Sequence, residues 1–177
     1  MNRDLKTILS KDFHRYGVNK VTSLGIYKRI FFSRTPGLRF ISVLRILQFH
    51  LVKSKVIASF FYLQYQRLKF KYGFDISYRT KIGAGFYLGH FGGVVVHGDT
   101  VIGDNCNLSH GVTIGISNHG PKKGIPTIGN NVFIGPGAVI VGKVKIGNNV
   151  TLGANTFVNF DVPDNTTVVN NGSVIID

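Results

Sequence analysis

Cysteine is almost absent from this 177-residue chain, which contains only Cys106. One cysteine cannot form an internal disulfide, so nothing in the sequence requires an oxidising compartment. The opening residues, MNRDLKTILSKDF, lack the apolar core of a signal peptide. We therefore expect a cytoplasmic protein. Its length suits one compact domain with a smaller helical appendage and is short for two separate globular domains.

Long hydrophobic runs are also missing. The apolar stretch from Val56 to Gln66 is bounded by Lys55 and Arg67. It falls short of the roughly 18 consecutive apolar residues that a membrane-spanning helix needs. The chain is therefore not expected to cross a membrane.

Acidic residues are scarce, and the resulting positive charge is uneven. Residues 1–81 hold 17 Lys and Arg against three Asp, a net +14, whereas residues 82–177 hold four Lys against five Asp, a net −1. Such asymmetry favours an anionic partner: a membrane surface, a phosphorylated substrate or nucleic acid. The alternative is a solvated basic surface that keeps the protein soluble. No recognised nucleic-acid-binding motif accompanies the basic residues, so we expect no nucleic-acid partner.

Residues 1–74 are predicted to be a basic, amphipathic, α-helical segment. Thr35 suits a helix N-cap and Pro36 the first helical position, and apolar residues recur at helical spacing from there to Tyr72. Seven basic residues interrupt this apolar surface: Arg39, Arg45, Lys53, Lys55, Arg67, Lys69 and Lys71. A segment of this kind can lie peripherally in an anionic lipid interface. It can equally pack helix on helix or against another subunit, and the sequence leaves both open.

After about Lys81 the apolar period becomes six. The aliphatic residues at this spacing are Ile102, Leu108, Ile114, Ile128, Ile134, Ile140, Ile146, Leu152 and Val158. A period of six predicts short strands that each carry one inward aliphatic residue and then turn, stacked so that the coils bury a continuous column. Gly and Asn residues between the strands are expected to supply positive φ angles: Gly129, Asn130, Asn131, Gly147, Asn148 and Asn149.

Two interruptions break the repeat. The earlier units at Ile82, Leu88 and Val94 differ in register by two residues from the later set. Residues 117–127, SNHGPKKGIPT, contain no hydrophobic anchor and are predicted to leave the coils as a loop. Irregular insertions in a regular solenoid usually border its functional face.

These hexapeptides, from about Asp75 to Ile176, resemble the left-handed β-helix acyltransferase superfamily. The stretch DISYRTKIGAGFYLGHFGGVVVHGDTVIGDNCNLSHGVTIG is similar to the serine acetyltransferase branch, and within it to members that act in polysaccharide biosynthesis. The resemblance implies a mainly β chain, with a left-handed parallel β-helix over residues 75–177 after the helical segment. It also implies acetyl-CoA as co-substrate, no metal ion, and a homotrimer or larger homo-oligomer.

The branch has a catalytic Asp and His fifteen residues apart, and Asp75 and His90 stand at that spacing within matching flanks. By the resemblance, His90 is the general base and Asp75 orients it. The chemistry suits these residue types. A hydroxyl is a poor nucleophile, an imidazole can take its proton during attack, and a carboxylate fixes the imidazole tautomer.

Two departures concern the acceptor. Serine acetyltransferases carry an Asp directly before this His, which helps to hold serine, and here the residue is Gly89. The second family His falls on Ile125, although His119 lies in the same loop. A sugar hydroxyl, which needs no partner for an ammonium group, fits these changes better. His110 and Gly92 are further candidates for contacts with the acceptor.

His119 is also an alternative base, because its surroundings resemble maltose and galactoside acetyltransferases, although Gly120 replaces the Pro expected after it. Cys106 could act as a nucleophile. It occupies a small inward position of a hexapeptide, however, so direct transfer is preferred. By the resemblance, CoA lies between the coils of neighbouring subunits, near Gly115, Gly135, Pro136, Lys122, Lys123 and Lys143.

The predicted function is therefore an acetyl-CoA-dependent O-acetyltransferase that modifies a sugar of a surface polysaccharide or its lipid-linked precursor. The basic segment would place it near the inner face of the cytoplasmic membrane. One alternative is a serine O-acetyltransferase of cysteine biosynthesis. A second is a non-catalytic β-helix scaffold or binding module, which the pairing of Asp75 with His90 argues against.

Overall fold

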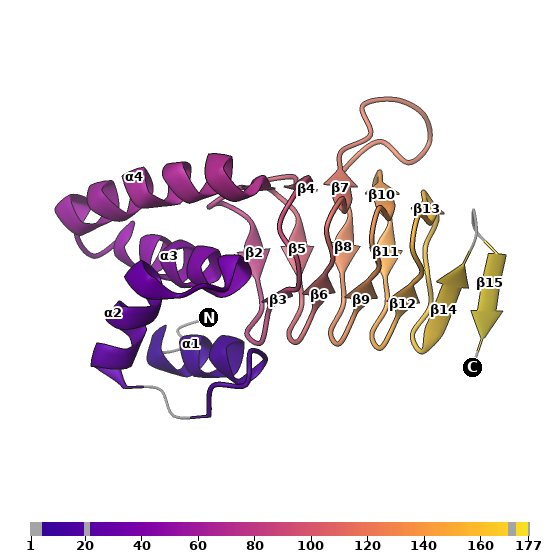
Figure 1. Cartoon of the computed structure of the whole chain (residues 1–177). Helices are drawn as coiled ribbons and strands as arrows, with labels where there is room; N and C mark the ends of the chain where they lie inside the picture. Colours follow the sequence, from indigo (N-terminus) through magenta and orange to yellow (C-terminus); the bar gives the residue numbers. More distant parts are fainter. Residues whose placement is uncertain (1–4, 20–21, 170–172, 177) are drawn as a thin grey trace.

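A computed structural model describes residues 5–19, 22–169 and 173–176, and it shows a helical segment at one end of a parallel β-solenoid (Figure 1). The helices are α1 (Leu5–His14), α2 (Ser23–Phe32), α3 (Pro36–His50) and α4 (Lys55–Tyr72). None of the helices in these residues is long and apolar enough to span a membrane. The predicted fold class, mainly β with a helical N-terminal segment, is confirmed.

The helical pattern predicted from Thr35 to Tyr72 is two helices. Thr35 stands at the N-cap of α3 without a side-chain capping bond, and Pro36 takes the first helical position as expected. The chain breaks after His50, and Ser54 caps α4 by accepting a hydrogen bond from the Ile57 N–H. Gly73 ends α4 with a φ of 67°, a left-handed conformation that glycine adopts without strain.

The solenoid has three sheets of short strands. The first contains β1 (Phe74–Ile76), β4 (Val94–Val96), β7 (Thr113–Gly115), β10 (Val139–Val141) and β13 (Phe157–Val158). The second contains β2 (Lys81–Ile82), β5 (Val101–Ile102), β8 (Thr127–Ile128) and β11 (Lys145–Ile146). The third contains β3 (Tyr87–Leu88), β6 (Asn107–Leu108), β9 (Phe133–Ile134), β12 (Thr151–Leu152), β14 (Thr166–Val169) and β15 (Ser173–Ile176), of which β15 alone is antiparallel to its neighbour.

Inward residues at the predicted spacing of six build the core, although β1 and β4 each bury two side chains, Phe74 with Ile76 and Val94 with Val96. In the first sheet these residues stack in register and are buried: Ile76, Val96, Ile114, Ile140 and Val158. The register shift has a definite place. Leu88 pairs with Leu108 on the next coil, and Val96 pairs with Ile114, so the two extra residues fall between β3 and β4 in the sequence GHFGG.

The turn residues divide into two kinds. Asn131 and Asn149 have positive φ, as expected, whereas Gly129, Asn130, Gly147 and Asn148 do not. The two glycines are needed for close approach instead. A Cβ on Gly129 would lie 2.5 Å from the carbonyl oxygen of Gly147 on the next coil. The prediction of positive φ is thus right for the second Asn of each turn and wrong for the residues before it.

A buried ion pair fastens the helices to the first coil. The Arg45 guanidinium binds Asp12 at 2.9 Å and donates to the carbonyls of Ile82 (2.7 Å) and Gly83 (2.5 Å). Asp12 in turn accepts a hydrogen bond from the Phe86 N–H at 2.9 Å. The sequence placed Arg45 on an exposed basic surface, and this prediction is wrong. Arg45 is buried and joins α1 and α3 to the β-solenoid.

Candidate functional site

His90 lies in the turn that contains the two extra residues, at the corner between the third and first sheets. His90 is exposed, and so is His110 at the same corner of the next coil. The centroids of the two imidazole rings are 5.9 Å apart and their planes meet at 81°. The corner therefore presents two adjacent histidines on the outside of the solenoid.

Backbone hydrogen bonds hold this corner. The Gly92 N–H donates to the Tyr72 carbonyl at 2.9 Å, and the Gly92 carbonyl accepts from the Gly111 N–H at 3.0 Å. The Gly92 N–H is thus engaged within the fold. The Gly93 N–H is the better candidate to stabilise an oxyanion at this turn.

Asp75 lies at the centre of β1 with its side chain turned outward and 60% exposed. Its carboxylate binds the Lys69 ammonium, with 2.6 Å between Nζ and Oδ1. The hydrogen bonds found across the described residues include none between Asp75 and His90. The structure therefore places both dyad candidates on the outer surface near one corner, but joins Asp75 to Lys69.

Lys69 was not singled out from the sequence as a site residue. It was only one of seven basic residues in a helical pattern. Its last-turn position in α4, followed by the Gly73 cap, brings it back to the strand that carries Asp75. A cation six residues before a candidate catalytic carboxylate, across a helix end, is the signal that could have identified it.

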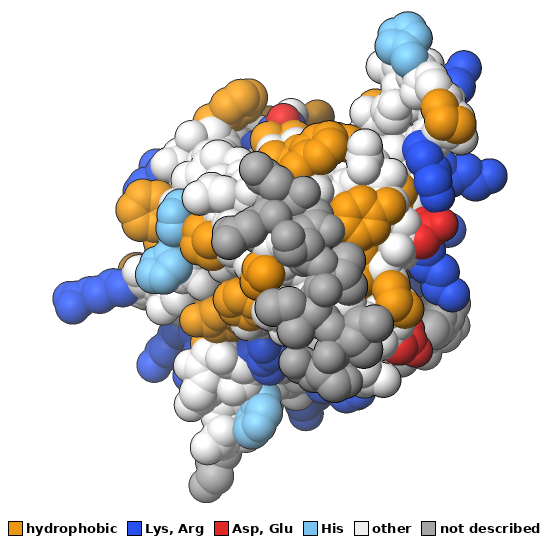
Figure 2. Space-filling view, turned by 90° about the vertical axis from the view of Figure 1, so that its right-hand side faces the viewer, with side chains coloured by type: hydrophobic (Ala, Val, Ile, Leu, Met, Phe, Trp, Pro, Cys, Tyr) orange, Lys and Arg blue, Asp and Glu red, His pale blue; other side chains and the backbone are white. Residues whose placement is uncertain are grey.

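The predicted loop is an excursion between β7 and β8, which Figures 1 and 2 show projecting from the solenoid. His119 and Lys123 are exposed on it. Lys122 binds Asp161 with 2.9 Å between Nζ and Oδ2. The Lys122 ammonium and the Lys145 N–H lower the pKa of Asp161. Lys122 thus tethers the excursion to the end of the β-solenoid and must leave Asp161 before it can bind another anion.

The predicted site residues form two groups within one chain. The first, at the corner between the third and first sheets, consists of Gly89, His90, Gly92, His110, Gly135 and Pro136. The second, at the far edge of the first sheet, consists of Gly115, His119, Lys122, Lys123 and Lys143. The chain from Gly111 to Ser117 crosses this sheet, a span of roughly 20 Å at about 3.3 Å per residue. One chain therefore does not bring His90 and His119 together.

Gly89 is not required by the backbone. It does not have a positive φ, and a Cβ there would meet only the ring of Tyr87, at 3.2 Å. A small movement of that ring would admit a side chain. The glycine therefore leaves the position before His90 open where the resemblance expects a carboxylate.

Cys106 is fully buried in the inward position predicted for it. Its thiol lies 3.1 Å from the Gly129 carbonyl, and burial raises its pKa to about 11. At neutral pH the sulfur is therefore protonated and inaccessible, which is unsuited to a nucleophile.

We expect Cys106 to resist iodoacetamide at pH 8 in the folded protein and to react once the chain is unfolded in urea. The reason is that both the thiolate fraction and access to the sulfur are low. Mass spectrometry of the alkylated protein measures this. Rapid alkylation without unfolding would contradict the burial described here.

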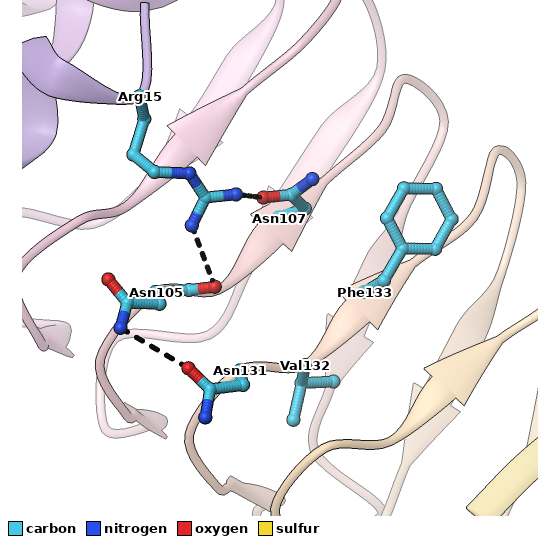
Figure 3. A pocket seen from close by; sticks show the side chains of 6 residues that line it. All are labelled: Arg15, Asn105, Asn107, Asn131, Val132 and Phe133. Atoms are coloured by element: carbon cyan, nitrogen blue, oxygen red, sulfur yellow. Dashed lines mark hydrogen bonds between the residues drawn. The ribbon is translucent and has the colours of Figure 1, made fainter.

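A shallow hollow elsewhere on the surface contains none of the predicted site residues. Figure 3 shows its lining: Arg15, Asn105, Asn107, Asn131, Val132 and Phe133. Arg15 donates to the Asn105 carbonyl at 3.0 Å and to the Asn107 side chain. Asn105 donates to Asn131 at 3.2 Å. Arg15 directly follows α1, and the asparagines belong to the solenoid. Their polar groups bind one another, so the hollow is part of the junction between the helices and the solenoid.

Known proteins resemble this chain in sequence. A family model described as bacterial transferase hexapeptide (six repeats) matches residues 125–159. A serine acetyltransferase of Helicobacter pylori is 39% identical over 104 residues, which are 59% of this chain and 61% of that protein. One from Staphylococcus epidermidis is 41% identical over 104 residues, 59% of this chain and 49% of that protein. The chain thus spans about half to three fifths of the length of these curated relatives.

Solved structures extend the likeness to the helices. Serine acetyltransferase from Brucella abortus strain S19, in complex with coenzyme A, matches with a TM-score of 0.78 and 26% identity, over 99% of this chain and 69% of that chain. The soybean serine acetyltransferase apoenzyme matches with a TM-score of 0.77 and 28% identity, over 97% of this chain and 69% of that one.

The family match, the curated relatives and the solved structures together support the hexapeptide-repeat acyltransferase superfamily, in its serine acetyltransferase-like branch. The prediction of a sugar acceptor in polysaccharide biosynthesis is wrong, because these relatives and structural neighbours are serine acetyltransferases. That prediction depended on Gly89 and Ile125, two single positions in a chain that follows the serine acetyltransferase fold over nearly all its described length. The alternative, a serine O-acetyltransferase, is favoured.

Proposed function

We propose that this chain is an acetyl-CoA-dependent serine O-acetyltransferase. The observation that carries the proposal is the match to serine acetyltransferases over both the helical segment and the solenoid. The position of His90 supports it, because this exposed histidine lies at the one turn where the coil is longer by two residues than its neighbours. A non-catalytic scaffold would not need a histidine pair at that turn.

In the proposed reaction, His90 takes the proton of the serine hydroxyl as its oxygen attacks the thioester carbonyl of acetyl-CoA. The tetrahedral intermediate carries its negative charge on the former carbonyl oxygen, which the Gly93 N–H stabilises. The C–S bond then breaks, the ester is released, and the CoA thiolate takes the proton from the His90 imidazolium. Asp75 orients the imidazole, for which its carboxylate must turn from Lys69.

The proposed site is shared between subunits. His90 and His119 lie at opposite edges of the first sheet, so one site can contain both only if a neighbouring chain supplies the excursion. A homotrimer of parallel solenoids would meet this requirement. His119 and His110 would then contact the acceptor from two sides.

Acetyl-CoA would bind along the same groove. The Brucella abortus structure is a complex with coenzyme A, which supports a CoA donor here. Gly115, Gly135 and Pro136 are the proposed backbone contacts, and Lys123 and Lys143 are the exposed cations available to the phosphates. Lys122 would join them on release from Asp161.

The deciding experiment measures release of free CoA from acetyl-CoA with L-serine as acceptor and L-alanine, which lacks the hydroxyl, as control. We expect turnover with serine alone and O-acetylserine as the product in mass spectrometry. Equal rates with serine, alanine and no acceptor would refute the proposal.

Replacing Gly89 by Asp is expected to lower the KM for serine about tenfold. The new carboxylate would pair with the ammonium group of serine, and a hydrogen bond between charged groups contributes roughly 1.5–3 kcal/mol. Steady-state kinetics measure the change. Gly89→Asn is the matched control, of equal size without charge, and an equal fall in KM for both variants would attribute the effect to shape.

A further inference from the structure

The helix α4 has two apolar faces, and only one is used by the fold. Ala58, Phe61, Tyr65 and Leu68 are buried against α3 and the first coil. The opposite face carries Val56, Phe60, Leu63 and Phe70, which are 82%, 48%, 68% and 79% exposed. Their spacing of four, three and seven residues aligns them in one stripe along the helix, about 20 Å long at 1.5 Å per residue. We call this set the outer stripe.

The outer stripe is surrounded by cations. Arg67 lies within it, between Leu63 and Phe70, and Lys71 follows it, all on exposed positions. Lys53 and Lys55 are exposed at the other end of the helix. Figure 1 shows α4 at the edge of the molecule, with α3 on one side only.

Carboxylates do not balance these charges. Among the described residues before Asp75, the one acidic side chain is Asp12, which is buried and bound to Arg45. Asp75, the next along the chain, is bound to Lys69. The outer stripe therefore lies in a strongly positive field.

The charge decides which partner fits. A second copy docked through the same face would bring two basic surfaces together, and like charges oppose that contact. An anionic lipid surface would accept apolar side chains into its acyl boundary and cations at its headgroups, the combination that α4 presents.

We propose that the outer stripe of α4 binds peripherally to an anionic lipid surface. Val56, Phe60, Leu63 and Phe70 enter the interface, and Arg67, Lys71, Lys53 and Lys55 contact the headgroups. The His90 corner lies at the C-terminal end of α4, where the Gly92 N–H donates to the Tyr72 carbonyl. This inference does not depend on the identity of the acceptor.

The test uses the full chain and cosedimentation with vesicles of phosphatidylcholine alone, or with about one third phosphatidylglycerol. We expect binding to the anionic vesicles and weaker binding as salt rises, because screening shortens the reach of surface charges. Arg67→Gln and Lys71→Gln should each weaken binding about fivefold. Leu63→Ser and Phe70→Ser should each weaken it roughly tenfold or more.

Phe133→Ser is the matched control, since Phe133 is 42% exposed on the solenoid and should bind as the parent does. Circular dichroism confirms that each variant is folded. Equal binding to both kinds of vesicle, or binding unchanged in Leu63→Ser and Phe70→Ser, would overturn the proposal. Sedimentation velocity without vesicles gives a further test. If the stripe variants alone form a smaller assembly than the parent, the outer stripe is an interface between copies and the proposal is overturned.

Discussion

Replacing His90 by Ala is expected to reduce kcat for acetyl transfer to serine by about 10²–10⁴, the usual contribution of a general base. Among the described residues of this turn and the matching turn of the next coil, His90 and His110 carry the imidazoles that can accept the proton of the serine hydroxyl. Because the side chain is exposed and lies in a turn, its removal should leave folding intact. CoA release and thermal unfolding, measured on the same preparation, separate the two effects.

Two variants sharpen this prediction. His14→Ala removes an exposed histidine from α1, far along the chain from the corner, and should keep the parent rate. His110→Ala tests the neighbouring ring, 5.9 Å from His90, and should raise the KM for serine more than it lowers kcat. If His90→Ala retains full activity and His119→Ala does not, the base is His119.

The solenoid could be predicted from the sequence because its periodicity is local. Each coil repeats the same requirement, one inward aliphatic residue every six positions, and Ile114, Ile140 and Val158 meet it. The register shift was visible in the sequence as well. The structural effect of the shift could not be predicted, because only the pairing of Val96 with Ile114 shows that the extra residues widen the turn containing His90.

The junction could not be predicted, since it depends on contacts between distant residues. Arg45 looked like one of several cations on an amphipathic surface, and its partner Asp12 is 33 residues away. The candidate site was incomplete for the same reason. The spacing of fifteen relates Asp75 to His90 along the chain, whereas the ion pair with Lys69 arises from how α4 ends beside β1.

Replacing Asp12 by Ala is expected to lower the free energy of unfolding by about 3–5 kcal/mol, the cost of leaving a buried charge unpaired. The Arg45 guanidinium would lose its carboxylate, and the Phe86 N–H its acceptor. Urea unfolding followed by circular dichroism measures the change. Asp99→Ala is the matched control: Asp99 also pairs with an arginine, Arg79, but both side chains are exposed, so the loss should stay within about 1 kcal/mol.

The double variant Asp12→Leu with Arg45→Met shows what the pair contributes in itself. Burial raises the pKa of Asp12 despite the opposing effect of Arg45, so desolvation costs the carboxylate more than the guanidinium returns. Replacing both charges by apolar side chains removes that desolvation cost, although the carbonyls of Ile82 and Gly83 lose a donor. The double variant should therefore be more stable than Asp12→Ala alone. If it is also less stable than the parent protein, the charged pair with its hydrogen bonds contributes more than its burial costs, and it holds the helices on the solenoid by its own strength.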